Sequence, residues 1–247
     1  MKYLIIGDVH ADLLAFENAV NYAAAKKLTL ISVGDLIDNC SGGPGVVKTM
    51  IKLLEQDRAQ VVIGNHEWKI YRWAIGNPVK ITPPNQITVD QMSVDVTFKN
   101  NFLKMMSYAK DYIKLTDKLF VTHAAIDPEF WNNTESPSKK QLEIMKYGSI
   151  DHKSELLHYR GETYNTRLYD WINNVPAGVT LFVGHDPRPL IGVPDFDNFQ
   201  VAPLVHKNAN SGVTVFLDCG SGKGGTLWGA VVNTVNNSIE ELRNFSV

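Results

Sequence analysis

The sequence has few cysteines, no long apolar run and almost no excess charge. Its 247 residues contain two cysteines, Cys40 and Cys219, too few for a disulfide framework, so we expect a cytoplasmic protein. The first apolar run, residues 3–6, is too short for a signal peptide or a membrane span, and we expect no membrane partner. A net charge of −2 argues against a stable nucleic-acid coat, but it allows a small site that handles one phosphate.

Three short apolar runs, which we predict to be strands, each end in a glycine followed by Asp or Asn. These strand ends are Gly7-Asp8-Val9-His10, Gly34-Asp35-Leu36-Ile37-Asp38 and Gly64-Asn65-His66-Glu67. In an open α/β sheet, ligands bind just beyond the carboxyl ends of the strands. We therefore expect these three strand ends to form the floor of one site.

The early part of the chain follows a β-α-β-α-β pattern, which is typical of a parallel α/β sheet. Predicted helices cover residues 12–27 (with Asp12 as N-cap), 46–55, 67–75, 95–115, 139–147 and 164–172. Residues 77–94 hold three prolines and no clear period, and we interpret them as an irregular insertion. A second, helical and polar insertion is expected near residues 127–160, within a single domain that spans residues 1–247.

Later strands are predicted without helices between them, and we assign them to a second, mixed or antiparallel sheet. They cover residues 119–121, 179–183 and 214–217, followed by a closing hairpin of residues 227–232 and 238–242. Two of them lead into a histidine, His123 and His185, which adds imidazoles to the strand-end set.

The strand-end side chains are carboxylates, imidazoles and one amide, without thiolates. This donor set suits Mn, Fe, Zn or Ni and argues against a structural cysteine–zinc site. One carboxylate such as Asp35 has two oxygens and can bridge two metal ions. Paired ions about 3.5–4 Å apart can share a hydroxide and hold a phosphoryl group.

Five motifs in order resemble those of the calcineurin-like metallophosphoesterases. They are the three strand ends above, then Thr122-His123-Ala124 and Gly184-His185-Asp186-Pro187, and Asp218-Cys219-Gly220 resembles the strand that follows in the bacterial and phage phosphoprotein-phosphatase branch. The resemblance implies an α/β fold, a two-layer β-sandwich flanked by helices, with a dinuclear metal site at the strand ends. It extends to lambda-type serine/threonine phosphatases and diadenosine tetraphosphatases.

The resemblance also implies a role for each matching position. Asp8 and His10 would bind the first metal, Asp35 would bridge, and the second metal would be completed by Asn65, His123 and His185. Two divalent ions, Mn²⁺ as first choice, would share the hydroxide that attacks phosphorus. His66 would protonate the leaving oxygen, with Asp38 orienting its imidazole.

The residue at one phosphate-binding position differs from the residue usual in the phosphoprotein-phosphatase branch. Asn39 stands where an arginine is usual, and a neutral amide cannot form a guanidinium fork on phosphate. Arg160 is similar in position to a second phosphate-binding arginine of the branch. Arg72, one turn after Glu67, and Arg188, just after the fifth motif, could also reach the site.

Residues 66–82 are similar to the phosphatase domain of bacterial polynucleotide kinase–phosphatase. With the neutral Asn39, this likeness favours a nucleotide or nucleic-acid phosphoester as substrate, and Trp68 offers a ring for a base. A serine/threonine phosphoprotein, diadenosine tetraphosphate and a catalytically silent, phosphate-binding protein are the alternatives. We interpret Glu67 as a first-turn helix carboxylate and Lys223 as part of a glycine-rich turn.

Overall fold

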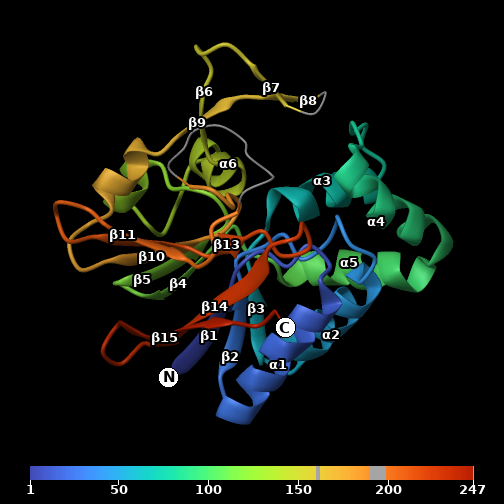
Figure 1. Cartoon of the computed structure of the whole chain (residues 1–247), viewed down its shortest axis with the longest axis horizontal. Coiled ribbons are helices and arrows are strands. Elements are labelled where there is room, and N and C mark those ends of the chain that lie inside the picture. The colour runs from blue at the N-terminus through green and yellow to red at the C-terminus, as the bar shows by residue number, and fades with distance from the viewer. Residues whose placement is uncertain (160–161, 190–198, 247) are drawn as a thin grey trace.

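Two β-sheets pack face to face, and helices lie on their outer sides (Figure 1). The computed structural model describes residues 1–159, 162–189 and 199–246. Within these ranges, no helix has the length and apolar character needed to cross a membrane.

The first sheet begins with the predicted parallel β-α-β-α-β unit. Its strands are β1 (Lys2–Ile6), β2 (Thr29–Ser32), β3 (Ala59–Val61), β13 (Asp218–Cys219), β14 (Thr226–Asn233) and β15 (Ser238–Asn244), in the order β13-β14-β1-β2-β3 with β15 also paired to β14. The connecting helices are α1 (Leu13–Lys26) and α2 (Gly43–Glu55). The Asp12 side chain accepts a hydrogen bond from the Ala15 N–H at 3.1 Å, which confirms the predicted N-cap.

The second sheet is mixed, as predicted. Its strands are β4 (Tyr112–Thr116), β5 (Leu119–Thr122), β10 (Thr180–Val183), β11 (Leu204–Lys207) and β12 (Val213–Phe216), in the order β11-β12-β10-β5-β4. Only the central strand β10 has parallel partners on both sides, β5 and β12. Buried apolar side chains from both sheets form the layer between them, among them Ile5, Ile31, Val33, Val121, Phe182 and Val215. Each contributes on the order of 1.5–3 kcal/mol by leaving water.

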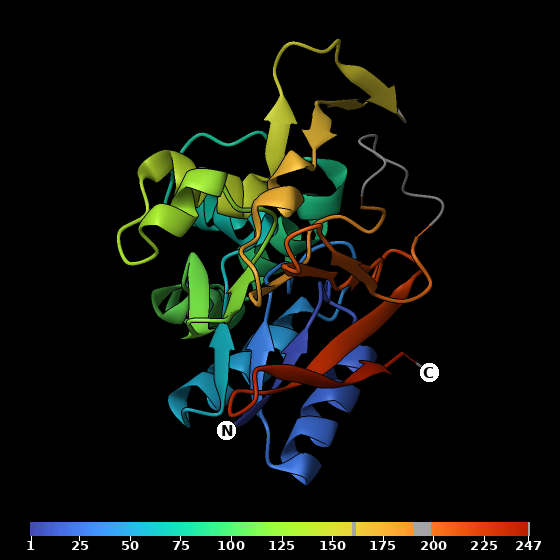
Figure 2. The same cartoon turned by 90° about the vertical axis from the view of Figure 1, so that its left-hand side faces the viewer.

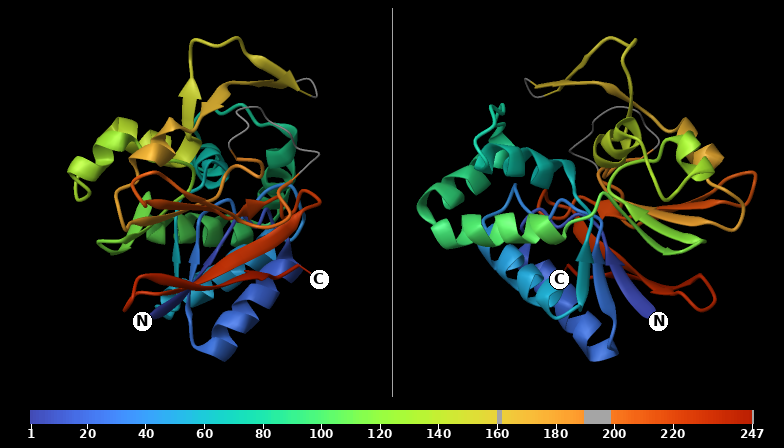
Figure 3. Two further views of the ribbon diagram at one scale, coloured as in Figure 1. Left: turned by 60° about the vertical axis from the view of Figure 1, so that its left-hand side comes forward. Right: turned by 180° about the vertical axis from the view of Figure 1, so that it is seen from behind.

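The sandwich brings the carboxyl ends of strands from both sheets to one edge. Nδ1 of His123, just after β5, lies 2.9 Å from the carbonyl oxygen of Val33, just after β2. The backbone N–H of His185, just after β10, donates to the carboxylate of Asp8, just after β1. Strand ends that are far apart in sequence therefore meet where the two sheets come together (Figure 3).

The remaining elements lie around this edge. The helices are α3 (Asn65–Ala74), α4 (Pro83–Val94), α5 (Val96–Tyr108) and α6 (Lys139–Tyr147), with short 3₁₀ turns at Pro128–Asn132 and Asp170–Asn174. Two small ribbons pair β6 (Ser149–Asp151) with β9 (Thr166–Leu168), and β7 (Leu157–Tyr159) with β8 (Glu162–Tyr164). Figure 2 shows both ribbons projecting from the end of the molecule that carries α6.

The segment 77–94 is not irregular throughout, because α4 occupies its second half. Thr82 is the N-cap and Pro83 and Pro84 fill the first turn, where proline's missing N–H has no helical partner to lose. The expected helix over residues 95–115 ends at Tyr108, and β4 follows it. Pro83 and Pro84 therefore start a helix, where the sequence analysis expects an irregular insertion.

Two other expectations were wrong. Residues 164–172 do not form a helix: β8 ends and β9 runs through this segment, and a 3₁₀ turn follows. The closing hairpin does not join the second sheet, because β14 pairs along the whole of β1 in the first. Both faces of β14 are largely buried, with Leu227, Ala230 and Val232 fully covered, so it suits a position inside a sheet.

Candidate metal centre

The loops that follow the strands have unusual backbone geometry. His10, Asp35, Asp38 and His185 have positive φ values of 46°, 50°, 72° and 70°. Such conformations cost about 1–3 kcal/mol each outside glycine and persist only where the surroundings impose them. Here the carbonyl oxygen of Asp35 accepts both the Val9 and the His10 N–H, at 3.0 and 2.9 Å, which ties the first two loops together.

Glu67 holds the Asp35 loop from the first turn of α3. Its buried carboxylate accepts the N–H groups of Asp35 and Leu36, both at 2.7 Å, and those of Ile37 and Gly64 at 3.3 and 3.1 Å. Burial and the neighbouring Asp35 carboxylate raise the pKa of Glu67 to about 8, against the opposing effect of these N–H donors. The first-turn position predicted for Glu67 is confirmed, and its carboxylate organises a neighbouring loop as well.

Close packing around the loops requires glycine at two strand ends. A Cβ atom on Gly64 would lie 2.1 Å from Oδ1 of Asp35, and one on Gly184 would lie 1.9 Å from Oδ1 of Asp8. Any larger residue would push these carboxylates out of the site. The repeated glycine in the strand-end motifs therefore has a steric cause.

One cluster of possible metal donors surrounds Asn65. Its Oδ1 lies 2.9 Å from Nε2 of His123 and 2.8 Å from Nδ1 of His185, and the two ring nitrogens are 3.2 Å apart. Nδ1 of His123 must carry the proton, because it faces a carbonyl oxygen that can only accept. Nε2 therefore presents a lone pair toward the Asn65 oxygen, and two such lone pairs at 2.9 Å favour a cation between them.

A second cluster forms around His10. Its Nδ1 lies 3.2 Å from the Ile37 carbonyl oxygen and 2.9 Å from the Asn39 side-chain amide, and the tautomer that donates from Nδ1 to the carbonyl leaves a lone pair on Nε2. That buried Nε2 has no hydrogen-bond partner and lies 3.9 Å from Oδ2 of Asp8 and 3.7 Å from Oδ2 of Asp35. Asp35 Oδ2 also lies 3.5 Å from Nε2 of His123, so this one oxygen adjoins both clusters.

The donor atoms fall into two groups close enough to share one ion each: His10, Asp35 and His66, and Asp35, His123 and His185. Burial lowers the pKa of His10, His123 and His185, so these imidazoles are neutral, which is the form that binds metal. Burial acts to raise the pKa of Asp35, but the surrounding imidazoles outweigh it and hold that pKa well below its usual range. The chain thus carries two His/Asp clusters that suit a dinuclear metal site.

His66 differs from the other histidines in its partners. Its Nδ1 lies 2.7 Å from Oδ2 of Asp38, and the same carboxylate oxygen accepts a hydrogen bond from the Asn85 side chain. Burial opposes protonation, but the carboxylates of Asp35 and Asp38 raise the pKa of His66 above its usual value. Unlike the three neutral histidines, His66 therefore tends to hold a proton.

The Asn85 contact extends into a chain of hydrogen bonds. The Asn85 oxygen accepts from the Thr82 hydroxyl at 2.6 Å, and that hydroxyl oxygen accepts from the Lys69 ammonium at 3.2 Å. Asn85 is almost fully buried, at 1% exposure. Sequence features do not indicate this role, because Asn85 lies in the segment expected to be irregular.

Lys223 lies in the glycine-rich turn after β13 and acts on the same centre. Burial raises the pKa of Asp8 and lowers those of His10 and His185, and the Lys223 ammonium lowers all three. A Cβ atom on the adjacent Gly222 would lie 2.4 Å from the His10 carbonyl oxygen, so this turn packs directly against the first strand-end loop. The turn itself was predicted from its glycines. Their spacing does not indicate that the Lys223 ammonium acts electrostatically on the centre.

The phosphate-binding residues predicted from sequence have different surroundings. The Asn39 side-chain amide lies 2.9 Å from Nδ1 of His10, so it supports that ring, and its contact with a substrate phosphate stays a prediction. Arg72 lines a pocket together with Asn65. Arg160 lies outside the described residues. Trp68, offered as a ring for a base, stacks on Tyr71 with 5.7 Å between ring centroids.

A profile of the calcineurin-like phosphoesterase family matches residues 1–214. The chain therefore belongs to the calcineurin-like metallophosphoesterases, hydrolases that act on phosphoric ester bonds, as its fold and its His/Asp clusters also indicate.

Individual relatives narrow the comparison. The chain is 29% identical over 205 residues to the asymmetrical bis(5′-nucleosyl)-tetraphosphatase PrpE of Anoxybacillus flavithermus, covering 76% of this chain and 79% of that protein. It is 27% identical over 209 residues to the PrpE protein of Bacillus velezensis, covering 77% and 80%. A crystal structure described as a candidate diadenosine tetraphosphatase matches with a TM-score of 0.62 and 18% identity, covering 98% of this chain and 93% of that one. That structural likeness shows a shared fold.

We predict that Glu67→Gln lowers the free energy of unfolding by about 2–4 kcal/mol, because an amide nitrogen would face backbone N–H donors that now have an acceptor. Urea denaturation of the metal-free protein above about pH 9, where Glu67 with its pKa of about 8 is ionised, measures this loss. Glu17→Gln, an exposed position on α1, is the matched control and should change stability by less than about 0.5 kcal/mol. Equal stability of the two variants would contradict the role given to Glu67.

Proposed function

We propose that the centre holds two divalent metal ions through six side chains, and that His66 is not among them because Asp38 holds its ring. Asp8, His10 and Asp35 bind the first ion, and Asp35, Asn65, His123 and His185 bind the second. The unpartnered, buried Nε2 of His10 supports this assignment, since a buried polar atom without a partner is otherwise costly. The donor set fits Mn²⁺, Fe, Zn²⁺ or Ni²⁺, with Mn²⁺ as the first choice for oxygen-rich coordination.

Each side chain then has a distinct task in phosphoester hydrolysis. Bound metal ions would supply positive charge for the phosphate oxygens and lower the pKa of a nucleophilic water. His66 holds a proton at the edge of the centre and delivers it to the departing oxygen. Asp38 accepts a hydrogen bond from the Nδ1–H of His66 and so fixes the orientation of the ring. Asn85 donates to the same carboxylate and so fixes the orientation of Asp38.

We propose that the substrate is a bis(5′-nucleosyl) tetraphosphate such as diadenosine tetraphosphate. Water would add across the link between the first and second phosphates, which gives one nucleoside monophosphate and one nucleoside triphosphate. The similarity to two asymmetrical tetraphosphatases over about four fifths of their length carries this proposal. The sequence features favoured a nucleotide or nucleic-acid phosphoester, and these relatives support the diadenosine-tetraphosphate alternative better.

Two observations fit a polyphosphate better than a phosphoserine. The neutral Asn39 offers no guanidinium fork for a terminal phosphate dianion. Lys223, whose charge acts on Asp8, offers an ammonium, which binds as a point charge and does not demand one planar geometry. A catalytically silent protein is disfavoured because every expected metal-binding position carries a competent side chain. The two free cysteines, Cys40 and Cys219, support a cytoplasmic location.

We expect Asp35→Asn to abolish hydrolysis of p-nitrophenyl phosphate, because an amide has one coordinating oxygen and no charge to share between two ions. Metal content measured by mass spectrometry of the purified variant should fall from two ions per chain toward one or none. Chelation of the wild-type protein should give the same loss of activity, and added Mn²⁺ should restore it. Full turnover in the variant or after chelation would disprove the dinuclear centre.

His66→Ala should keep its metal content but lose about 10²–10⁴-fold in kcat, since it removes a proton donor. The loss should be greater for alkyl phosphates than for p-nitrophenyl phosphate, whose leaving group needs little protonation. Asn85→Ala should show the same dependence on leaving group with a smaller loss, because it disturbs Asp38 without removing the imidazole. Loss of a metal ion from His66→Ala would make His66 a ligand instead.

The substrate assignment predicts at least tenfold higher kcat/KM for diadenosine tetraphosphate than for a phosphoserine peptide, about 1.4 kcal/mol of transition-state binding. Chromatography of the products should show ATP and AMP, without ADP. Asn39→Arg should lower the ratio of kcat/KM for diadenosine tetraphosphate to kcat/KM for the phosphopeptide, because the added guanidinium favours the phosphopeptide. A tenfold preference for the peptide in the wild-type protein, or ADP as the sole product, would overturn the proposal.

A further inference from the structure

Two pockets lie beside the metal centre and share Tyr147, at the C-terminal end of α6. The first, here called the cationic pocket, has a volume of about 390 Å³. Three basic side chains line it, Lys69, Arg72 and Lys80, and none of the described residues in its wall is acidic. Arg72 lies close enough to act on the Tyr147 hydroxyl, where burial raises the pKa of that group and the guanidinium lowers it.

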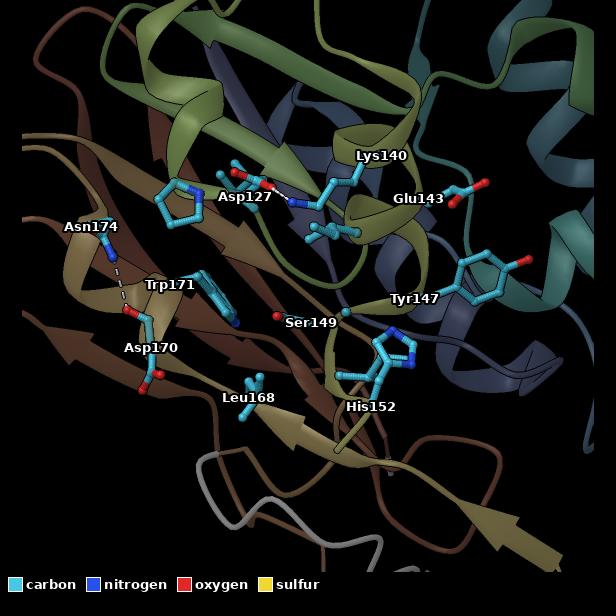
Figure 4. A pocket seen from close by; sticks show the side chains of 15 residues that line it. Asp127, Lys140, Glu143, Tyr147, Ser149, His152, Leu168, Asp170, Trp171 and Asn174 are labelled. Atoms are coloured by element: carbon cyan, nitrogen blue, oxygen red, sulfur yellow. Dashed lines mark hydrogen bonds and ion pairs between the residues drawn. The ribbon is translucent and has the colours of Figure 1, made fainter. Parts of the chain in front are cut away.

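The second, here called the aromatic pocket, has a volume of about 580 Å³ and a mostly apolar wall. Figure 4 shows Tyr147, His152 and Trp171 around this pocket, with the Asp127 carboxylate at its rim paired to Lys140. Its size is in the range of small-molecule sites, and flat rings beside a few polar groups are typical of nucleoside recognition.

Each pocket adjoins the metal centre through one residue of its wall. Asn65, whose oxygen faces His123 and His185, is itself part of the wall of the cationic pocket. Gly148 lines the aromatic pocket, and a Cβ atom there would lie 3.8 Å from Cδ2 of His185. A substrate phosphate at the centre therefore has one pocket on each side of Tyr147.

We infer that the two pockets bind the two unequal arms of a dinucleoside polyphosphate: the cationic pocket holds the triphosphate arm, and the aromatic pocket holds the nucleoside of the monophosphate arm. This inference rests on the proposed function. It adds the subsites that make the cleavage asymmetrical.

The charge of the cationic pocket indicates that it binds the triphosphate arm. Three phosphates carry at least three negative charges, and the wall of the cationic pocket gathers three basic side chains. Lys69 is oriented by the Thr82 hydroxyl at 3.2 Å, so this cation belongs to the same hydrogen-bonded chain that ends at His66. The wall is thus positioned together with the group that protonates the departing oxygen.

The short distance between the aromatic pocket and the centre indicates that this pocket binds the nucleoside of the monophosphate arm. In asymmetrical cleavage, only one phosphate separates the reacting link from the nearer nucleoside. Gly148, in the wall of the aromatic pocket, is a neighbour of the His185 ring, so a short linker can reach from the centre to this pocket. Tyr147, which is partly exposed, offers a ring to the base at its entrance.

The test uses inhibition of p-nitrophenyl phosphate hydrolysis by orthophosphate, tripolyphosphate and AMP at fixed free Mn²⁺. Arg72→Ala and Lys80→Ala should raise the inhibition constant of tripolyphosphate at least fivefold and that of AMP less than twofold. Tyr147→Ala should raise the ratio of the AMP constant to the orthophosphate constant at least fivefold, and Tyr147→Phe, which keeps the ring, should restore it to within twofold.

Lys26→Ala is the matched control, because Lys26 is exposed at the end of α1. If the Arg72 and Lys80 variants respond to tripolyphosphate as Lys26→Ala does, the cationic subsite is disproved. An unchanged AMP ratio in Tyr147→Ala disproves the nucleoside subsite. Turnover of diadenosine tetraphosphate by the wild-type protein separates failure of the subsites from failure of the proposed function. If the wild-type protein hydrolyses this substrate but the variants keep wild-type inhibition constants, only the subsites are rejected. If the wild-type protein does not hydrolyse it, the proposed function is rejected.

Discussion

The architecture of the centre depends on how Asp35 is held. Its φ is positive, and its own N–H is fixed by the buried Glu67 carboxylate, while its carbonyl oxygen gathers the Val9 and His10 N–H groups. These contacts place Oδ2 within 3.5–3.8 Å of imidazole nitrogens from three different segments of the chain, those of His10, His66 and His123. One carboxylate can occupy that position only because the backbone around it is over-determined, so the cost of its strained conformation is met by the surrounding hydrogen bonds.

The arrangement concentrates negative charge and lone pairs where water is excluded. Asp8, Asp35 and Asp218 are all buried, and burial together with their mutual repulsion raises the pKa of Asp8. Buried carboxylates of this kind are stable when paired with cations, and Lys223 alone cannot neutralise them. Metal binding and folding of the strand-end loops are therefore expected to stabilise each other.

Most members of the two His/Asp clusters could be predicted from the sequence, because all except His123 follow a strand whose end is marked by a glycine, and close packing requires that glycine at Gly64 and Gly184. The parallel β-α-β-α-β start was predictable for the same reason: its apolar periods are clear. The position of β14 beside β1 was not, since pairing between the two ends of the chain leaves no local signal. Asn85 and Lys223 were missed because their importance comes from contacts across the fold, and their neighbours in sequence indicate only turns.

The start of α4 shows how a segment outside the strand-end motifs becomes part of the centre. Pro83 and Pro84 fix the first turn of this helix, Thr82 caps it, and the cap places Asn85 in hydrogen-bond contact with Asp38. Asp38 in turn holds the ring of His66, and Thr82 also accepts from Lys69 in the cationic pocket. A carboxylate held by two donors has fewer orientations, so the imidazole it positions is also more narrowly fixed. Helix α4, which the sequence analysis did not predict, is thus the element that supports both the cationic pocket and the ring of His66.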